Sequence, residues 1–498
     1  MTITSADPLQ VGEAVDARPS RRLRIALLLI AVTQLTLVLD ATIVTVALPH
    51  IQESLHFSNA SLQWIVTAYT LVSGGMLLLG GRLGDLLGRR NTLIGGMILF
   101  TTASLMGGLA QSEAWLIVCR VAQGIGAAVM APATLALIYD NFPDGQLRNR
   151  AMSVWAAMSA LGGAVGLLAG GLLTTYASWR WTLFVNIPIG VAVVALAPLV
   201  LAPSTGRRER LDLLGSVTVT LGIAALIYGL SSAAPTGAFD HAHWGTAKVI
   251  VSLIAGAVLV GAFLVTEATV SQPLLPLRLL AHRGRAGSYL VAACIGVAFF
   301  GVLYFLTLFL QEVWGYSPAK AGLAFLPWVV TFAGSATISG RLLPRLGART
   351  LLISGATIAA AGLGWLAFVH ADSSYATHVL GPIIVAPFGV GLMAVPLASL
   401  AMTDVDPAEA GVAASLLSVG QQIGASLGIA GLGTVAWTIV AHRLAGQQNP
   451  TSDVYRGALA AGFDRGFLIT AGAMVLALLC AFVVKSPSAA PTEDTAAA

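Results

Sequence analysis

The sequence predicts an all-α membrane protein that crosses the bilayer many times, and three observations support this. The 498-residue chain is 57% hydrophobic and only 10% charged, whereas soluble domains carry about 25% charged residues. Long apolar runs recur along its whole length, and most approach the ~20 residues that a helix needs to span a bilayer. The runs lack the alternation over about ten residues that marks barrel strands, so we expect helices.

Fourteen apolar runs divide the chain, and we expect each to form one transmembrane helix. Fourteen is an even number, which places both termini on the same side of the membrane, and twelve would do the same. The runs cover roughly residues 24–48, 61–80, 93–111, 114–138, 150–174, 181–201, 212–232, 247–267, 287–311, 320–342, 350–370, 376–402, 411–440 and 463–484.

Arginines gather in alternate loops, before the first run and after the second, fourth, sixth, eighth and tenth. Cytoplasmic loops carry such an excess of positive charge, so we expect both termini in the cytoplasm and the protein in the cytoplasmic (inner) membrane. The polar ends, residues 1–20 and 486–498, are expected to be disordered cytoplasmic tails.

The remaining composition argues against several other classes of protein. The net charge of +4 comes from scattered loop arginines, so nucleic acid is not an expected partner. The three cysteines lie far apart in apolar runs, which indicates neither a disulfide nor a metal site. The chain lacks the phosphate-binding pattern G-x-x-x-x-G-K-[ST] and a nucleophile elbow. We therefore expect no enzyme, no cofactor and a monomer.

A basic, glycine-rich segment between the second and third runs organises the chain. Residues Gly81–Asn91 read GRLGDLLGRRN, and residues Gly340–Thr350 repeat G-R-L and then L-G-x-R, 259 positions later. The arginines alone are explained by a loop held in the cytoplasm. The glycines indicate close helix approach and a tight turn, and the repeat indicates that the chain is duplicated.

The duplication predicts the domain organisation. Pro132 and Pro143 recur as Pro396 and Pro407, both 264 positions later. We therefore expect a six-helix bundle over residues 21–205, a second over 286–485, and an inserted helix pair over 206–285. Parallel repeats of this kind form two bundles with a binding site between them near the bilayer midplane.

Five segments of the chain resemble one known family. Gly81–Asn91 resembles the signature loop of the major facilitator superfamily. Leu39–Pro49 (LDATIVTVALP), Arg120–Gly126 (RVAQGIG), Trp179–Trp181 and Asn186–Gly190 resemble segments of its 14-span drug:proton antiporter branch, the multidrug exporters. The resemblance covers essentially the whole chain and implies alternating access, with transport driven by the proton gradient.

Asp40 is the strongest candidate for proton coupling. It is the only carboxylate well inside an apolar run, where a charge costs several kcal/mol and faces a partner or a cavity. Arg120 is its expected partner, because both lie at a similar depth; the resemblance implicates this arginine in proton handling. The alternatives are a permanent structural pair for Asp40 and bonds to helix carbonyls for Arg120.

Two glycine motifs have expected mechanical roles. Gly162, Gly166, Gly170 and Gly171 form a strip for close helix contact that resembles an antiporter motif, although Leu167 stands where that motif has proline. Plain small-residue packing explains the strip nearly as well. The resemblance makes Gly81–Asn91 a conformational latch: Asp85 would meet the helix start near Gly411, and Arg82 or Arg89 would pair with Asp404, Asp406 or Glu409. The latch residues are Gly81, Arg82, Asp85, Gly88, Arg89 and Arg90.

The substrate site is less specified by the sequence. Each candidate is also explained by packing, and the scarcity of deep carboxylates favours a neutral or singly charged amphiphile over a divalent cation. The candidates for the cavity wall are Gln34, Thr36, Tyr69, Gln123, Asn186, Tyr304, Gln311, Trp328, Gln421 and Gln422.

Together these features predict a proton-coupled antiporter that exports amphipathic small molecules such as drugs, antibiotics or related metabolites. Its expected partners are the substrate, protons and the lipid bilayer. A dedicated transporter of one metabolite on the same fold is the first alternative, and a membrane sensor that transports nothing is the second.

Overall fold

The computed structural model describes residues 20–483 except 143–144, 205–211, 236–241, 271–272, 404, 406–408, 446 and 448–449. Within these ranges the chain is helical and contains no strand, so the all-α prediction is confirmed. The two expected tails lie outside the described residues, apart from Ser20.

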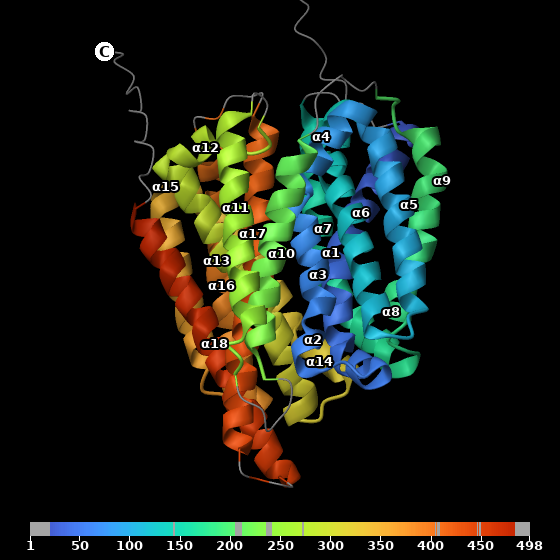
Figure 1. The fold of residues 1–498 in the computed structure, drawn as a ribbon. Helices are drawn as coiled ribbons and strands as arrows, with labels where there is room; N and C mark the ends of the chain where they lie inside the picture. The colour runs from blue at the N-terminus through green and yellow to red at the C-terminus, as the bar shows by residue number, and fades with distance from the viewer. Residues whose placement is uncertain are drawn as a thin grey trace, which may run out of the picture.

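The first half of the chain forms one bundle, drawn from blue to teal-green in Figure 1. Its long helices run roughly parallel or antiparallel to one another, and short helices connect them at one end. The elements are α1 (Arg21–Leu55), α2 (Asn59–Leu62), α3 (Trp64–Gly75), α4 (Leu77–Leu87), α5 (Arg89–Gly108), α6 (Glu113–Asn141), α7 (Gln146–Tyr176), α8 (Trp181–Phe184) and α9 (Asn186–Val200).

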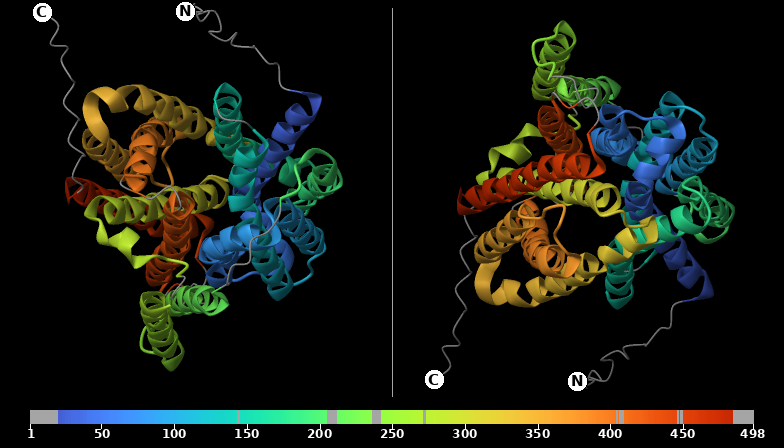
Figure 2. Two further views of the ribbon diagram at one scale, coloured as in Figure 1. Left: turned by 90° about the horizontal axis from the view of Figure 1, so that it is seen from above. Right: turned by 90° about the horizontal axis from the view of Figure 1, so that it is seen from below.

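The second half forms another bundle beside the first, drawn from yellow to red (Figure 2). Between the two in sequence come α10 (Leu213–Ala233), α11 (Ala247–Thr269) and α12 (Leu277–Ala281). The second bundle consists of α13 (Arg283–Leu308), the π-helix η1 (Phe309–Val313), α14 (Pro318–Ala324), α15 (Leu326–Leu366), the π-helix η2 (Tyr375–Val379), α16 (Leu380–Ala401), α17 (Ala410–Leu444) and α18 (Ser452–Val483).

The helix pair α10 and α11 lies at the edge of the molecule (Figure 2). α10 packs against α3 and α17, one helix from each bundle, whereas α11 packs mainly against α10. In the apolar stretch of α11 only 17% of the residues are buried in the protein, whereas 78% are buried in that of the segment Arg283–Val313. The pair therefore flanks the junction of the two bundles.

The helices fall at the fourteen predicted positions. Within the described part of the chain, eleven are long and apolar enough to cross a membrane, or up to twelve with the bent pair α3–α4. α5, with 20 residues, occupies the predicted third span. α15 is continuous over 41 residues but has a kink at Gly347, and its two parts occupy the tenth and eleventh predicted spans.

The structure reproduces the duplication seen in the sequence. Gly88 ends α4 with φ of 86°, and Gly347, 259 positions later, kinks α15 with φ of 74°. A backbone with such positive φ favours glycine. Ser58 and Ser317, separated by the same 259 positions, both cap short helices by accepting a hydrogen bond from a backbone N–H three residues on. Matching turns at a fixed offset indicate that the two bundles share one plan.

The glycine strip of α7 lies directly against α1. A Cβ added at Gly162, Gly166 or Gly170 would lie within 2.9 Å of a backbone carbonyl oxygen of α1. Those oxygens belong to Leu35, Leu39 and Ile43, spaced one turn apart like the glycines. The strip therefore lets the two backbones touch along about two turns.

The two bundles meet at the end of the molecule that carries α2 and α14. Ala319 N–H donates to Thr175 Oγ1 across the bundles at 3.0 Å, and Gly171 faces the backbone of Pro318 and Ala319. Gln311, in the π-turn η1, donates from Nε2 to the Val46 carbonyl of α1 at 2.9 Å. The bundles are thus joined at this end, opposite to the end with the Gly81–Asn91 loop, which we call the arginine-rich end.

The close contact between α1 and α7 yields a stability prediction. Gly170→Ala should destabilise the protein by about 1–3 kcal/mol, because the new methyl group meets the fixed Ile43 backbone. Gly163→Ala is the matched control on the same helix, since nothing lies within 4 Å of a Cβ there. Thermal unfolding of the purified protein in detergent measures both; equal stabilities would show that the helices separate without cost.

Candidate functional site

A fully buried ion pair lies inside the first bundle. Arg120 of α6 donates from Nη1 to Asp40 Oδ2 of α1 at 2.6 Å. The Asp40 side chain is 0% exposed and that of Arg120 is 1% exposed. The predicted partners therefore do meet, although 80 positions separate them.

Two amides complete the shell around the Asp40 carboxylate. Gln123 Nε2 and Asn186 Nδ2 both donate to Oδ1, at 3.0 and 2.7 Å. Gln123 also donates to Ser104 Oγ at 2.7 Å, and its Oε1 accepts from Arg120 Nη1 at 2.9 Å. The carboxylate thus accepts three hydrogen bonds, two from α6 and one from α9, which offset part of the desolvation of a buried charge.

Arg120 is held by two further contacts. Its Nε donates to the Ile65 carbonyl at 2.9 Å, and its guanidinium lies 4.4 Å from the centre of the Tyr69 ring. Tyr69 in turn donates its hydroxyl to the Leu37 carbonyl of α1 at 3.3 Å. The arginine is therefore fixed between a carboxylate, a carbonyl and an aromatic face.

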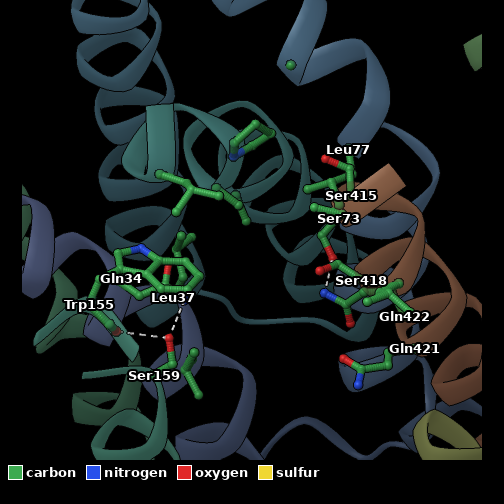
Figure 3. Close-up of a pocket in the computed structure, with 18 of the residues that line it drawn as sticks. Gln34, Leu37, Ser73, Leu77, Trp155, Ser159, Ser415, Ser418, Gln421 and Gln422 are labelled. Carbon is green, nitrogen blue, oxygen red and sulfur yellow. Dashed lines mark hydrogen bonds between the residues drawn. The ribbon is translucent and has the colours of Figure 1, made fainter. Parts of the chain in front are cut away.

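A cavity of about 2020 Å³ lies between the bundles. It extends from the arginine-rich end, where Asp85, Asp140 and Gly411 line it, to Leu167 and Phe325 near the joined end. Figure 3 shows its middle part: Gln34, Leu37, Trp155 and Ser159 face it from one side. From the other side come Ser73, Leu77, Ser415, Ser418, Gln421 and Gln422.

The ion pair is next to the cavity but does not line it. Leu37 and Ala41 of α1 lie on the cavity wall, whereas Asp40 between them points into the bundle. Tyr69 lines the cavity and also covers Arg120. Tyr69 therefore lies between the cavity and the ion pair.

The predicted cavity residues divide into three groups. Gln34, Tyr69, Trp328, Gln421 and Gln422 lie on the wall. Gln123 and Asn186 belong to the Asp40 network instead, because their amides are the hydrogen-bond donors that the buried carboxylate requires. The other three lie elsewhere: Thr36 bonds its own helix, Gln311 bonds α1, and Tyr304 is 1% exposed in the second bundle.

The predicted latch residues, except Arg90, line the mouth of the cavity on the side of the first bundle. Gly88 turns the chain between α4 and α5, and the Arg90 N–H donates to Ser204 Oγ at 3.1 Å. Gly81, Arg82 and Asp85 line the same cavity as Gly411.

Ion pairs of Arg89 and of Glu409 lie at the mouth of the cavity. Arg89 pairs with Asp140 of its own bundle at 2.5 Å and lies 3.8 Å from Asp85. Glu409 pairs with Arg278 rather than with Arg82 or Arg89, because α12 approaches the start of α17. Asp404 and Asp406 lie outside the described residues.

Sequence reasoning missed Ser104, Ser415 and Ser418. Ser104 is one hydroxyl among apolar residues, and nothing in the sequence distinguishes it from a serine bonded to its own helix. Ser415 and Ser418 were detectable, because with Gln421 they repeat every three residues and so share one helix face.

Comparison with known proteins identifies the family of the chain. Residues 30–429 match the family model of the Major Facilitator Superfamily. The chain belongs to this superfamily. It is therefore a multi-pass membrane protein of a transporter family, and the predicted resemblance is confirmed.

Curated relatives are similar over most of their length. The puromycin resistance protein pur8 of Streptomyces alboniger is 40% identical, over 98% of this chain and 96% of its own. The cephamycin export protein CmcT of Amycolatopsis lactamdurans is 41% identical, over 82% and 84%. The inward-facing crystal structure of a bacterial homologue of the lysosomal transporter Spinster shares the fold, with a TM-score of 0.65, 17% identity and coverage of 94% and 98%.

The buried pair yields a prediction on stability. Asp40→Asn or Arg120→Gln alone should destabilise the protein by roughly 3–5 kcal/mol, since each leaves one buried charge without its counter-charge. The double variant should be less destabilised than the sum of the two. Thermal unfolding in detergent measures the cycle, and additive effects would mean that the two charges do not stabilise each other.

Proposed function

We propose that this protein is a proton-coupled antiporter that exports amphipathic small molecules through the cavity between its bundles. The observation that carries the proposal is the Asp40–Arg120 pair, buried beside the cavity and joined to it through Tyr69. The names of the relatives, which include antibiotic resistance and export proteins, support export as the direction.

The proposed proton carrier is the Asp40 carboxylate. A proton on Asp40 removes its negative charge and weakens its hold on Arg120 Nη1. Arg120 then keeps its bonds to Ile65 and Gln123 but loses its counter-charge. A buried cation in this state favours a conformation in which water or another acceptor reaches it. Protonation therefore shifts the balance between conformations of the first bundle.

Substrate acts on the same pair through Tyr69. A molecule that presses on the Tyr69 ring moves a group that covers the guanidinium and bonds the Leu37 carbonyl. Binding of substrate and binding of a proton thus act on the same Asp40–Arg120 pair and shift the same conformational equilibrium. This is the physical requirement for coupling.

The cavity is accessible at the arginine-rich end, which the positive-inside rule places in the cytoplasm. The contacts of Ala319 and Gln311 close the opposite end. Export requires the reverse arrangement, in which Asp85 approaches the start of α17 near Gly411. A helix N-terminus attracts a carboxylate, so Asp85 would stabilise the closed mouth.

The proton gradient supplies enough free energy for this task. Each proton that enters releases about 2.3 kcal/mol per 100 mV and about 1.4 kcal/mol per pH unit. One proton per cycle therefore sustains a concentration ratio of roughly tens to several hundredfold for a neutral substrate.

Two alternative functions are compatible with the same fold, and each is distinguished by a transport assay. A dedicated transporter of one metabolite would respond to a single compound class in a competition panel. A sensor would move no substrate in vesicles.

The proton role of Asp40 is tested in reconstituted vesicles with a pH-sensitive dye inside. Asp40→Asn should abolish substrate-evoked proton movement, because an amide does not exchange a proton as a carboxylate does. Asp453→Asn is the matched control, since Asp453 is exposed at the other end of the molecule. Size-exclusion chromatography checks that each variant is folded, and uphill transport by Asp40→Asn would rule out this carrier.

The latch role of Asp85 predicts an effect on rate. Asp85→Asn should lower turnover severalfold and leave substrate affinity within about twofold, because Asp85 acts on closure rather than on the bound substrate. Initial export rates at several substrate concentrations measure both. A loss of affinity at unchanged turnover would contradict a latch.

A further inference from the structure

One face of α17 presents unpaired hydrogen-bonding groups to the cavity. Ser415, Ser418 and Gln421 line it, and their side chains have no hydrogen-bond partner among the described residues. Their neighbour Gln422 differs, because its Nε2 donates to Ser73 Oγ at 3.0 Å. We call these three residues the α17 polar strip (Figure 3).

The polar group on the other side of the cavity is already satisfied. Gln34 donates to Ser159 Oγ at 2.9 Å and accepts from Thr134 Oγ1 at 3.4 Å. Trp155 Nε1 donates to the same Thr134 hydroxyl at 3.1 Å. In this part of the cavity the α17 polar strip therefore offers unpaired hydrogen-bonding groups, whereas Gln34 and Trp155 are already paired.

Aromatic rings of the second bundle line the same cavity. Phe299 of α13 lies 6.1 Å from Trp328 of α15, centre to centre, and 5.1 Å from Phe300. All three line the cavity together with Phe325 and Phe332. This aromatic wall offers apolar surface and ring faces for stacking.

The interior of the cavity carries no charged side chain among the described residues. The five charged lining residues lie at the mouth: Arg82, Asp85, Arg89, Asp140 and Glu409. On α17 itself, Gln421 follows Glu409 by twelve residues, or roughly 18 Å of helix. Asp40 and Arg120 lie behind the wall and neutralise each other. A molecule in the interior therefore meets neutral donors, acceptors and rings.

We propose that the α17 polar strip and the aromatic wall form a binding site for uncharged aromatic molecules that carry amide or hydroxyl groups. This deepens the function proposed above and rests on the same cavity. The uncharged polar groups of such a molecule replace their hydrogen bonds to water by hydrogen bonds to the two serine hydroxyls and the Gln421 amide, which costs little free energy. A permanent organic cation loses hydration and finds no carboxylate, and the rings alone attract it only weakly. The site therefore discriminates by charge.

Binding of two probes to the purified full-length protein tests the charge preference. Chloramphenicol is an uncharged aromatic amide with hydroxyl groups, and tetraphenylphosphonium is a permanent aromatic cation that donates no hydrogen bond. Equilibrium dialysis of the radiolabelled probes should give a Kd at least about tenfold lower for chloramphenicol. Equal or tighter binding of the cation would overturn the proposal.

Substitutions of Gln421 locate the site. Gln421→Glu should tighten tetraphenylphosphonium binding about tenfold and weaken chloramphenicol binding, because it places a carboxylate in the interior. Gln447→Glu is the matched control, since it adds the same charge at an exposed position outside the cavity. Unchanged affinities in Gln421→Glu would overturn the assignment to the strip.

Milder variants keep the test decisive if Gln421→Glu does not fold. Gln421→Leu and Ser418→Ala should each weaken chloramphenicol binding severalfold and leave the weak binding of tetraphenylphosphonium unchanged. Unaltered chloramphenicol affinity in both would overturn the proposal.

Binding without a gradient also separates this inference from the proposed function. If the probes bind with the expected Kd values but Asp40→Asn still transports uphill, the proton role of Asp40 is wrong and the proposed substrate class stands. If Asp40→Asn abolishes proton coupling but the cation binds more tightly than chloramphenicol, the proposed substrate class is wrong and the proton role of Asp40 stands.

Discussion

The buried ion pair between Asp40 and Arg120 constrains much of the first bundle. Each charge is tolerated only because the other lies 2.6 Å away, so α1 and α6 must stay in register with each other. Asn186 at the start of α9 and Gln123 on α6 add the donors that the carboxylate needs. The glycine strip of α7 then holds α1 from the other side. Close packing and a polar network thus fix the same helix.

This arrangement separates the Asp40–Arg120 pair from the interior of the cavity. The cavity interior is lined by rings, hydroxyls and amides, whereas the pair lies one side chain behind the wall. Tyr69 belongs to both, because one part of it lines the cavity and its ring covers Arg120. In the proposed mechanism a substrate therefore need not carry charge to influence the pair, which agrees with the neutral character of the α17 polar strip.

The two repeats of the duplicated chain differ at the turn that follows the second and the tenth predicted spans. Gly88 and Gly347 occupy equivalent turns, but Asp85 has its counterpart in Pro344, which offers no carboxylate. At this turn the first bundle thus carries a carboxylate and the second bundle carries a proline. At the other end, α14 packs against α7 through glycines and backbone, so that closure there depends on shape rather than charge.

The sequence by itself determined the class, the approximate positions of the helices, the duplication and the pairing of Asp40 with Arg120. Each of these depends on local hydropathy, on spacing along the chain or on the high energy of an unpaired charge in lipid. Only the tertiary structure decided that Gln123 and Asn186 join the pair, that Arg89 binds Asp140, and that Tyr304 and Gln311 lie away from the cavity. The sequence does not say whether the face of an apolar helix that carries a polar residue points to the cavity, to another helix or to lipid. The packing of the other helices decides this.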